Sequence, residues 1–275
     1  MKFRSTLSKV VVEIFLMFVA LTCIFPIVWM ISTSLKSKSE VYTNMGLIPK
    51  AFHFDNYLVA WNEGISTYFL NSVIYVICVV SAVVIISSMA AYFFAKLDFP
   101  FKKYIFGIFV ASIMIPVPGS FVPIYVLLVK LHIQDTRIGY MLPLISSGLA
   151  MGIFILKTFF ESVPKQIEES AKIDGCSKLI IYFRIIIPLS IPAISTIVIF
   201  NTLGVWNEFL LASVIFTNNK LMPIQQGISV FIGQRFTQYE LYMASTVIAI
   251  APIVLLYTVL NKQVLNGIAT GAIKE

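Results

Sequence analysis

Long apolar stretches with almost no charged side chains dominate this sequence and leave it few ways to fold. Residues Phe69–Ala95 form a run of 27 residues without a single charge. A membrane-spanning helix needs about 20 apolar residues at a rise of 1.5 Å each. Overall, 59% of the 275 residues are hydrophobic and 12% are charged, against roughly 45–50% and 25% in soluble domains. A water-soluble core could not hide so much apolar surface, so the sequence predicts an all-α integral membrane protein.

Six segments are long and apolar enough to cross a membrane. The third contains the run Ile115-Pro116-Val117-Pro118-Gly119, which predicts a break towards its far end. The fifth is longer than one straight crossing, and Pro188 and Pro192 near its start predict a kink. The six predicted spans are Val10–Ser32, Phe69–Ala95, Tyr104–Val129, Ile138–Phe160, Ile185–Thr217 and Leu241–Leu260.

The first span follows basic residues, as a signal peptide would, but its length of about 22 residues exceeds a typical signal core. It also ends without a small-residue cleavage site, so we interpret it as a retained span. The chain length fits one membrane domain covering 1–275.

Lys and Arg predict the orientation of these spans. With the N-terminus in the cytoplasm, thirteen of the 20 basic residues fall on the inner side and seven on the outer side. Inner loops of membrane proteins carry this excess, so both termini are expected in the cytoplasm. The segment Lys36–Tyr68 then forms an outer loop with the turn-rich run Thr43-Asn44-Met45-Gly46.

Several function classes are excluded or weakened by what the sequence lacks. The net charge of +7 comes from residues scattered between apolar stretches, so no basic patch for nucleic acid is predicted. The three cysteines and two histidines have no metal-ligand spacing, and no disulfide framework is expected. No phosphate-binding loop of the G-x-x-x-x-G-K-[ST] type is present, so no nucleotide is expected to bind by that route.

The polar stretch Glu161–Arg184 lies between the fourth and fifth spans, on the predicted inner side. Pro164 suits the start of a helix over Lys165–Asp174, in which Glu168 and Lys172 have the favourable i,i+4 spacing. Gly175 predicts a left-handed helix stop, and Ser177 can cap a second helix that runs through Ile187. The sequence therefore predicts a helix–turn–helix elbow. The alternative is an amphipathic hairpin lying on the bilayer surface, which is disfavoured because such hairpins are usually Lys/Arg-rich.

This loop resembles the E-A-A…G…I-x-L-P signature of the permeases of binding-protein-dependent importers. The residues that match are Glu169, Ser170, Ala171, Asp174, Gly175, Ile185, Ile187 and Pro188. Ser170 stands where Ala is usual and Ile187 where Leu is usual, and both replacements are small. The resemblance implies the type I ABC importer transmembrane fold, with a core at about 69–262, an additional N-terminal span at 10–32 and a coupling loop at 161–187. It also implies that Glu169, Ala171 and Gly175 contact an ATP-binding-cassette subunit.

Further segments are similar to the smaller six-span permease of maltose-type carbohydrate importers. They are Phe25–Met30, Asn71-Ser72, Ala91-Tyr92, Trp206–Phe209 and the tail Gly271–Glu275. The resemblance implies four kinds of partner beside membrane lipid: two ATPase subunits, a second related permease, an extracytoplasmic solute-binding protein and a sugar. In the family the tail reaches towards the ATPases, whereas a frayed terminus explains it equally well. Phe101 stands where that group often has Gly, so a looser inner turn is expected.

Glu208 is the one acidic side chain placed well inside a predicted span, and such groups are functional candidates. Two interpretations stay open: it lines the sugar path or outer gate, or it makes a structural hydrogen bond near the interface. Trp206 and Asn207 share both interpretations. An ion-coupled secondary transporter is the alternative function, but it normally carries acidic or His relays inside its spans. A membrane hydrolase is weaker still, because no nucleophile–base motif is present.

Overall fold

The computed structural model of the chain describes residues 2–114, 117–233 and 237–272. Within these ranges every regular element is helical, and one isolated β-bridge joins Ile232 to Thr237. The all-α prediction is therefore confirmed. The chain forms two compact units, one from Met1–Ser66 and Ile228–Pro252, the other from Thr67–Gly227 and Ile253–Glu275.

The first unit contains α1 (Lys2–Ser34), a helix whose apolar side chains are exposed from Val10 onwards. The predicted outer loop contains three short elements: α2 (Lys38–Thr43), α3 (Asp55–Ala60) and the π-helical turn η1 (Trp61–Ile65). A fourth short element of this unit, the 3-10 turn η5 (Ser229–Phe231), comes later in the chain. The long helix α14 (Tyr239–Ala272) begins here. An apolar helix surface of this kind needs lipid or another helix around it.

A buried lysine organises the predicted outer loop, which belongs to the first unit up to Ser66. Lys36 is 2% exposed, and its Nζ donates to the carbonyls of Asn44 and Gly46 at 2.7 Å each. Asn56 donates in turn to the carbonyls of Ser34 and Lys36. Buried polar groups are stable only when paired in this way. The predicted turn at Thr43–Gly46 thus wraps around one ammonium group.

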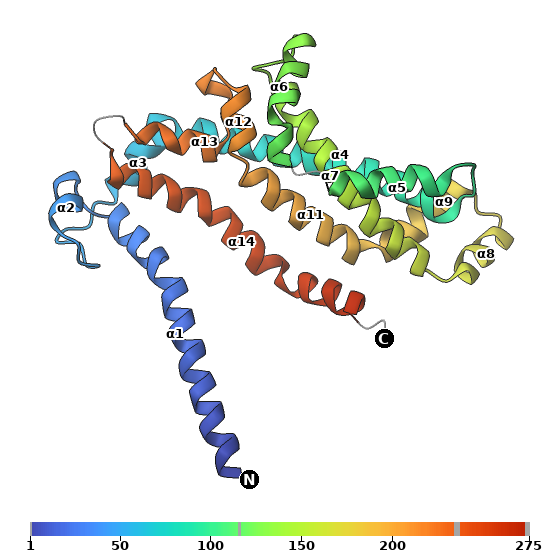
Figure 1. Ribbon diagram of the computed structural model, residues 1–275, viewed down its shortest axis with the longest axis horizontal. Helices are drawn as coiled ribbons and strands as arrows, with labels where there is room; N and C mark the ends of the chain where they lie inside the picture. The colour runs from blue at the N-terminus through green and yellow to red at the C-terminus, as the bar shows by residue number, and fades with distance from the viewer. Residues whose placement is uncertain (1, 115–116, 234–236, 273–275) are drawn as a thin grey trace. The chain divides into compact units, whose positions relative to one another are not determined.

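The second unit contains the remaining long helices (Figure 1). Helix α4 (Ser66–Lys96) is followed by α5 (Lys102–Ile113), the 3-10 turn η2 (Val117–Ser120), α6 (Phe121–Lys130) and α7 (Arg137–Ser162). Helices α5 and α11 (Ile191–Trp206) pack alongside α7. The other elements are α8 (Lys165–Ile173), α9 (Lys178–Ile181), the π-helical turn η3 (Tyr182–Ile186), α10 (Ile187–Leu189), α12 (Leu210–Ile215), η4 (Asn219–Leu221) and α13 (Ile224–Ile228).

Close contact at α7 depends on two glycines one turn apart. A Cβ on Gly148 would lie 2.9 Å from Val83 Cγ2 of α4 and would collide with Asn201 Oδ1 of α11. A Cβ on Gly152 would lie 2.8 Å from Ser87 Oγ. Membrane helices gain their packing energy at such small-residue seams, because lipid supplies no hydrophobic drive between them.

Four predicted spans coincide with helices that are long and apolar enough to cross a membrane, in α1, α4, α7 and α14. The fifth predicted span, Ile185–Thr217, overlaps a bent pair of helices, Lys178–Leu189 and Ile191–Trp206, with 72° between its parts. Its predicted end is not part of this pair, because α11 ends at Trp206 and Leu210–Ile215 forms a separate short helix. Counting that pair as one span, the described residues give five, so the count of six stays a prediction. The difference is the third segment.

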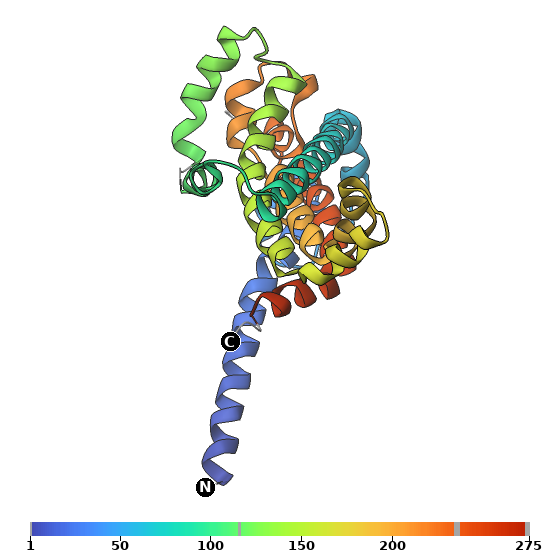
Figure 2. The same cartoon turned by 90° about the vertical axis from the view of Figure 1, so that its right-hand side faces the viewer.

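The third predicted span consists of two short helices. Helix α5 has 12 residues and α6 has 10, so neither alone covers a hydrocarbon core of about 30 Å. In Figure 2 α5 is seen nearly end-on while α6 runs steeply away from it. The predicted break at Ile115–Gly119 lies partly outside the described residues, but Val117–Ser120 does form a tight turn.

Candidate functional site

The polar loop between α7 and α11 folds as the predicted helix–turn–helix. Helix α8 starts after Pro164 and ends at Asp174. Gly175 has φ +79°, its N–H donates to the Lys172 carbonyl, and the next N–H donates to the carbonyl of Ala171. These two bonds form a Schellman motif, which requires the left-handed conformation that glycine adopts freely. Ser177 then caps the second helix by accepting from the N–H of Ile180.

The residues of the importer signature lie on different sides of this elbow. Glu169, Ser170, Asp174 and Gly175 are exposed. Ala171 is 6% exposed and belongs to the hydrophobic core of the unit. Within this chain Ala171 therefore packs inwards, while its four neighbours form an exposed surface at the tip.

The signature ends where the chain bends. Ile185 and Ile187 are half-buried, Pro188 is exposed, and the 72° bend falls at Ser190. Ser190 Oγ donates to the Ile186 carbonyl at 2.6 Å. Pro192 stands at the start of α11, where a missing N–H costs nothing, and Pro188 lies near the end of the helix that precedes the bend. The predicted kink is confirmed, and it joins the elbow directly to α11.

The i,i+4 spacing favours a pair between Glu168 and Lys172. In the structure Glu168 instead forms an ion pair with Lys96 at the end of α4. The distance from Lys96 Nζ to Glu168 Oε1 is 2.5 Å, and both side chains are about nine-tenths buried. No local sequence pattern joins these residues, because they come from helices far apart in the chain.

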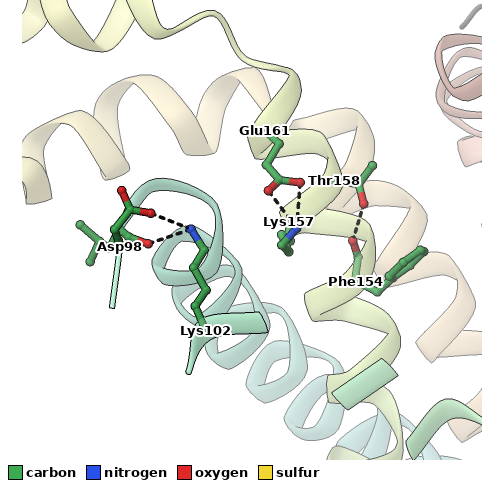
Figure 3. Close-up of polar contacts among 7 residues, drawn as sticks. Asp98, Lys102, Phe154, Lys157, Thr158 and Glu161 are labelled. Atoms are coloured by element: carbon green, nitrogen blue, oxygen red, sulfur yellow. Dashed lines mark hydrogen bonds and ion pairs between the residues drawn. The ribbon is translucent and has the colours of Figure 1, made fainter. Parts of the chain in front are cut away.

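Two other lysine–carboxylate pairs join residues four apart, one at the turn between α4 and α5 and one on α7 (Figure 3). Lys102 Nζ lies 3.4 Å from Asp98 Oδ1, and Lys157 Nζ lies 2.8 Å from Glu161 Oε1. Phe101 has φ +62°, the left-handed conformation that glycine adopts freely, at the position where the resembling group often has Gly. The expectation of a looser turn stays a prediction.

Glu208 caps the start of α12. Its Oε1 accepts from the Leu211 N–H at 2.6 Å, and its Oε2 accepts from the Ala212 N–H and from Tyr140 Oη, both at 3.0 Å. A carboxylate near the N-terminus of a helix satisfies otherwise unpaired N–H groups. These contacts give Glu208 the structural role that was one of its two open interpretations.

Glu208 also lines a cavity of about 670 Å³. The polar residues of its lining are Ser112, Ser120, Ser146, Ser147 and Glu208. The rest of the lining is mainly apolar, from α5, α6, α7 and α12: Ile113, Phe121, Ile124, Leu127, Leu128, Leu131, Ile133, Leu142, Pro143, Leu144, Ala150, Met151 and Leu211.

Trp206 and Asn207 do not share this cavity with Glu208. Trp206 is 4% exposed, and its ring meets Phe69 edge-on with centroids 5.5 Å apart. Asn207 is exposed and ends α11, where its side chain donates to the Leu203 carbonyl and accepts from Gln225. The structure thus brings Glu208 alone of the three to the cavity lining.

The segment 216–224 after α12 is held by side chains that the sequence left without a role. Arg137 donates to Asn71 Oδ1 at 2.9 Å. Asp135 accepts from Thr217 and from the N–H of Asn218. Three neighbours on α4 bond to the segment's backbone: Asn71 donates to the Lys220 and Met222 carbonyls, Tyr75 donates to that of Leu221, and Ser72 accepts from the Ile224 N–H. The Asn71-Ser72 pair, which is part of the resemblance, therefore holds the backbone of this segment against α4.

Comparison with known proteins places this arrangement in a family. Residues 83–269 match the family described as "binding-protein-dependent transport system inner membrane component". A probable ABC transporter permease of Bacillus subtilis is 30% identical over 96% of this chain and 88% of its own length. A diacetylchitobiose uptake permease of Streptomyces coelicolor is 30% identical over 91% and 84%.

A solved structure agrees in fold. One chain of a bacterial ABC transporter that imports the acidic polysaccharide alginate superposes with a TM-score of 0.83, at 22% identity, over 94% of this chain and 96% of that one. The chain therefore belongs to the family of inner-membrane components of binding-protein-dependent transport systems, and it is a multi-pass ABC transporter permease subunit, not an enzyme.

Proposed function

We propose that this chain is the permease subunit of an ATP-driven importer that carries a sugar or oligosaccharide across the cytoplasmic membrane. Two separate cytoplasmic subunits hydrolyse the ATP, a second related permease completes the pore, and an extracytoplasmic binding protein delivers the solute. The observation that carries this proposal is the exposed tip of the elbow, where Glu169, Asp174 and Gly175 stand free of the core.

The geometry of the elbow suits the transmission of force. A Schellman stop and a capped second helix make the turn short and fixed. The second helix continues to the bend at Ser190 and thence into α11. Closure of the ATPase dimer would displace the tip and shift the spans between inward-open and outward-open states, because packed helices move as rigid bodies.

The names of similar proteins support a sugar as the solute. One relative is named as a diacetylchitobiose uptake permease, and one solved neighbour belongs to a transporter that imports alginate. Serine hydroxyls and a carboxylate on otherwise apolar walls are the kind of lining that orients a polar solute. Glu208 is the side chain we assign to the path or outer gate of this subunit.

The proposed topology keeps both termini in the cytoplasm, with α5 and α6 together forming one broken crossing. Thirteen inner and seven outer basic residues support this orientation. A broken crossing is tolerated only where protein or water covers the free backbone groups, and the cavity lined by Ser112 and Ser120 lies next to this break.

Site-directed crosslinking tests the coupling role. A cysteine at Gly175 or Glu169, in a Cys176→Ser background, is expected to crosslink to co-expressed ATP-binding-cassette subunits, and ATP should change the yield. The matched control is Lys103→Cys, an exposed position at the start of α5 that lies outside the elbow. No crosslink at 175, or an equal yield at 103, would contradict the coupling role and favour the interpretation of the elbow as a hairpin on the bilayer surface.

A further inference from the structure

One ammonium group joins three elements at the inner end of the second unit. Lys96, the last residue of α4, pairs with Glu168 in the first turn of α8 at 2.5 Å. Its Nζ also donates to the carbonyl of Val163, which caps the end of α7, at 3.3 Å. The other lysine–carboxylate pairs among the described residues, at Lys102 and Lys157, join residues four apart and have more exposed carboxylates. The Lys96–Glu168 pair therefore differs from them in linking distant helices inside the protein.

Because this pair is buried, its main effect is on the relative orientation of the two helices. Two charges attract more strongly where water is excluded, but removing both from water has its own cost, so such pairs add little net stability. Deleting one partner, by contrast, leaves an uncompensated charge. A buried pair between two helices thus holds them in one relative orientation more than it stabilises the fold.

Two further side chains on the same stripe of α4 contact the elbow. Ser88, Tyr92 and Lys96 are each four residues apart and so lie along one side of the helix. Ser88 Oγ and Tyr182 Oη are hydrogen-bonded at 2.7 Å, and the rings of Tyr92 and Tyr182 lie 5.1 Å apart. The stripe reaches the first helix of the elbow through Lys96 and the second through Tyr182.

The adjacent carboxylates of α8 have opposite surroundings. Neighbouring residues on a helix point about 100° apart, so Glu168 faces α4 while Glu169 is exposed at the tip. One glutamate is available to a partner protein, and the other fastens the helix that bears it.

We propose that Lys96 is a positioning residue whose ion pair with Glu168 fastens α8 to the end of α4, so that a displacement of the elbow moves α4 with it. This inference rests on the proposed function for the source of the displacement. The fastening itself is a property of the permease alone.

Distance measurement between two spin labels tests the fastening. The labels are attached at Asp98→Cys, just beyond α4, and at Lys172→Cys on α8, both exposed, in a chain with Cys23, Cys78 and Cys176 changed to Ser. The permease is measured in lipid within its co-expressed complex, first without nucleotide and then with ATP and vanadate. We expect one narrow distance that nucleotide leaves unchanged, because the two helices move together.

Lys96→Met should broaden the distance distribution, because the unpaired Glu168 no longer holds α8 against α4, and should let nucleotide shift its mean. Lys96→Arg, which keeps the charge, should behave as the unchanged chain. Lys157→Met is the matched control, since it breaks an ion pair on α7 that the elbow does not use. If Lys96→Met fails to insert, the double variant Lys96→Met/Glu168→Met removes both charges and should show the same broadening.

The outcomes separate the two proposals. An unchanged distribution in both the single and the double variant would overturn the fastening, and a role in folding alone would lower the yield without broadening the distance. If ATPase subunits fail to co-purify or nucleotide alters no label pair anywhere in the complex, the proposed function fails. The nucleotide-free comparison of Lys96→Met with Lys96→Arg would still decide the fastening.

Discussion

Tyr140 Oη donates a hydrogen bond of 3.0 Å to Glu208 Oε2, which ties the first turn of α7 to the start of α12. Tyr140 is fully buried, and its ring lies 4.8 Å from that of Tyr75 and 5.1 Å from that of Phe216. Glu208 is thereby held in place by a rigid aromatic group on one side and by helix N–H groups on the other. The same carboxylate that lines the cavity is a structural cap.

Replacing Glu208 with Gln should lower the free energy of unfolding by about 1–3 kcal/mol. The carboxylate offers two acceptor oxygens to three hydrogen-bond donors, whereas the amide offers only one acceptor oxygen to the same donors. Tyr140→Phe removes a single donor and should cost about 0.5–1.5 kcal/mol. Thermal unfolding of the detergent-solubilised protein measures both. Unchanged stability of Glu208→Gln together with altered transport would assign the residue to the path alone.

Phe101→Gly should stabilise the chain by about 1 kcal/mol, because a bulky side chain at φ +62° is strained and glycine is not. The Phe101 side chain is 72% exposed, so little packing is lost. Tyr104→Gly, three residues on and inside α5, is the comparison and should destabilise by about 1 kcal/mol. Equal effects of the two changes on the unfolding midpoint would contradict the strain.

Local signals explain why the elbow could be predicted from the sequence. Pro164, Gly175 and Ser177 each act over a few residues, and together they define two helices and the turn between them. Apolar runs likewise identified four spans, since length and composition suffice there. Where the run was interrupted, as at α5 and α6, composition indicated one span and the backbone formed two short helices.

The partners of charged residues could not be predicted in the same way. Glu168 was assigned to Lys172 because only neighbours within a helix are visible in a sequence, whereas its partner Lys96 comes from another helix. Trp206 was grouped with Glu208 by adjacency, yet the end of α11 turns the indole onto Phe69 and leaves the carboxylate in the cavity. Tertiary packing decided both cases.

Asp135 should make the segment 216–224 sensitive to acid. Burial acts to raise the pKa of Asp135, but hydrogen bonds from the Thr217 hydroxyl and from the N–H groups of Asn218 and Thr217 outweigh it and lower the pKa. A carboxyl group with a depressed folded-state pKa adds stability above its unfolded pKa of about 3.9, and this stability is lost as the pH falls through the folded value.

Hydrogen exchange at the Thr217 and Asn218 amides, corrected for intrinsic rates, should therefore show no change in protection between about pH 5 and 8 and a loss below about pH 4. Asp135→Asn should give weaker protection that no longer varies with pH in this range. Asp98→Asn, at a fully exposed carboxylate in the turn between α4 and α5, is the matched control and should leave these amides unchanged. Persistence of the acid transition in Asp135→Asn would assign it to another group.

Gly148→Ala should destabilise the helix packing by about 1–3 kcal/mol, because the added methyl group would collide with Asn201 and press on Val83. Gly107→Ala on α5 is the matched control: nothing lies within 4 Å of its Cβ position, so the change should stabilise by up to about 1 kcal/mol. Adding Asn201→Ala to Gly148→Ala should recover part of the loss, since it removes the atom in the way. Unfolding midpoints in detergent measure all three, and equal shifts for Gly148→Ala and Gly107→Ala would mean that α7 and α11 are not in close contact in solution.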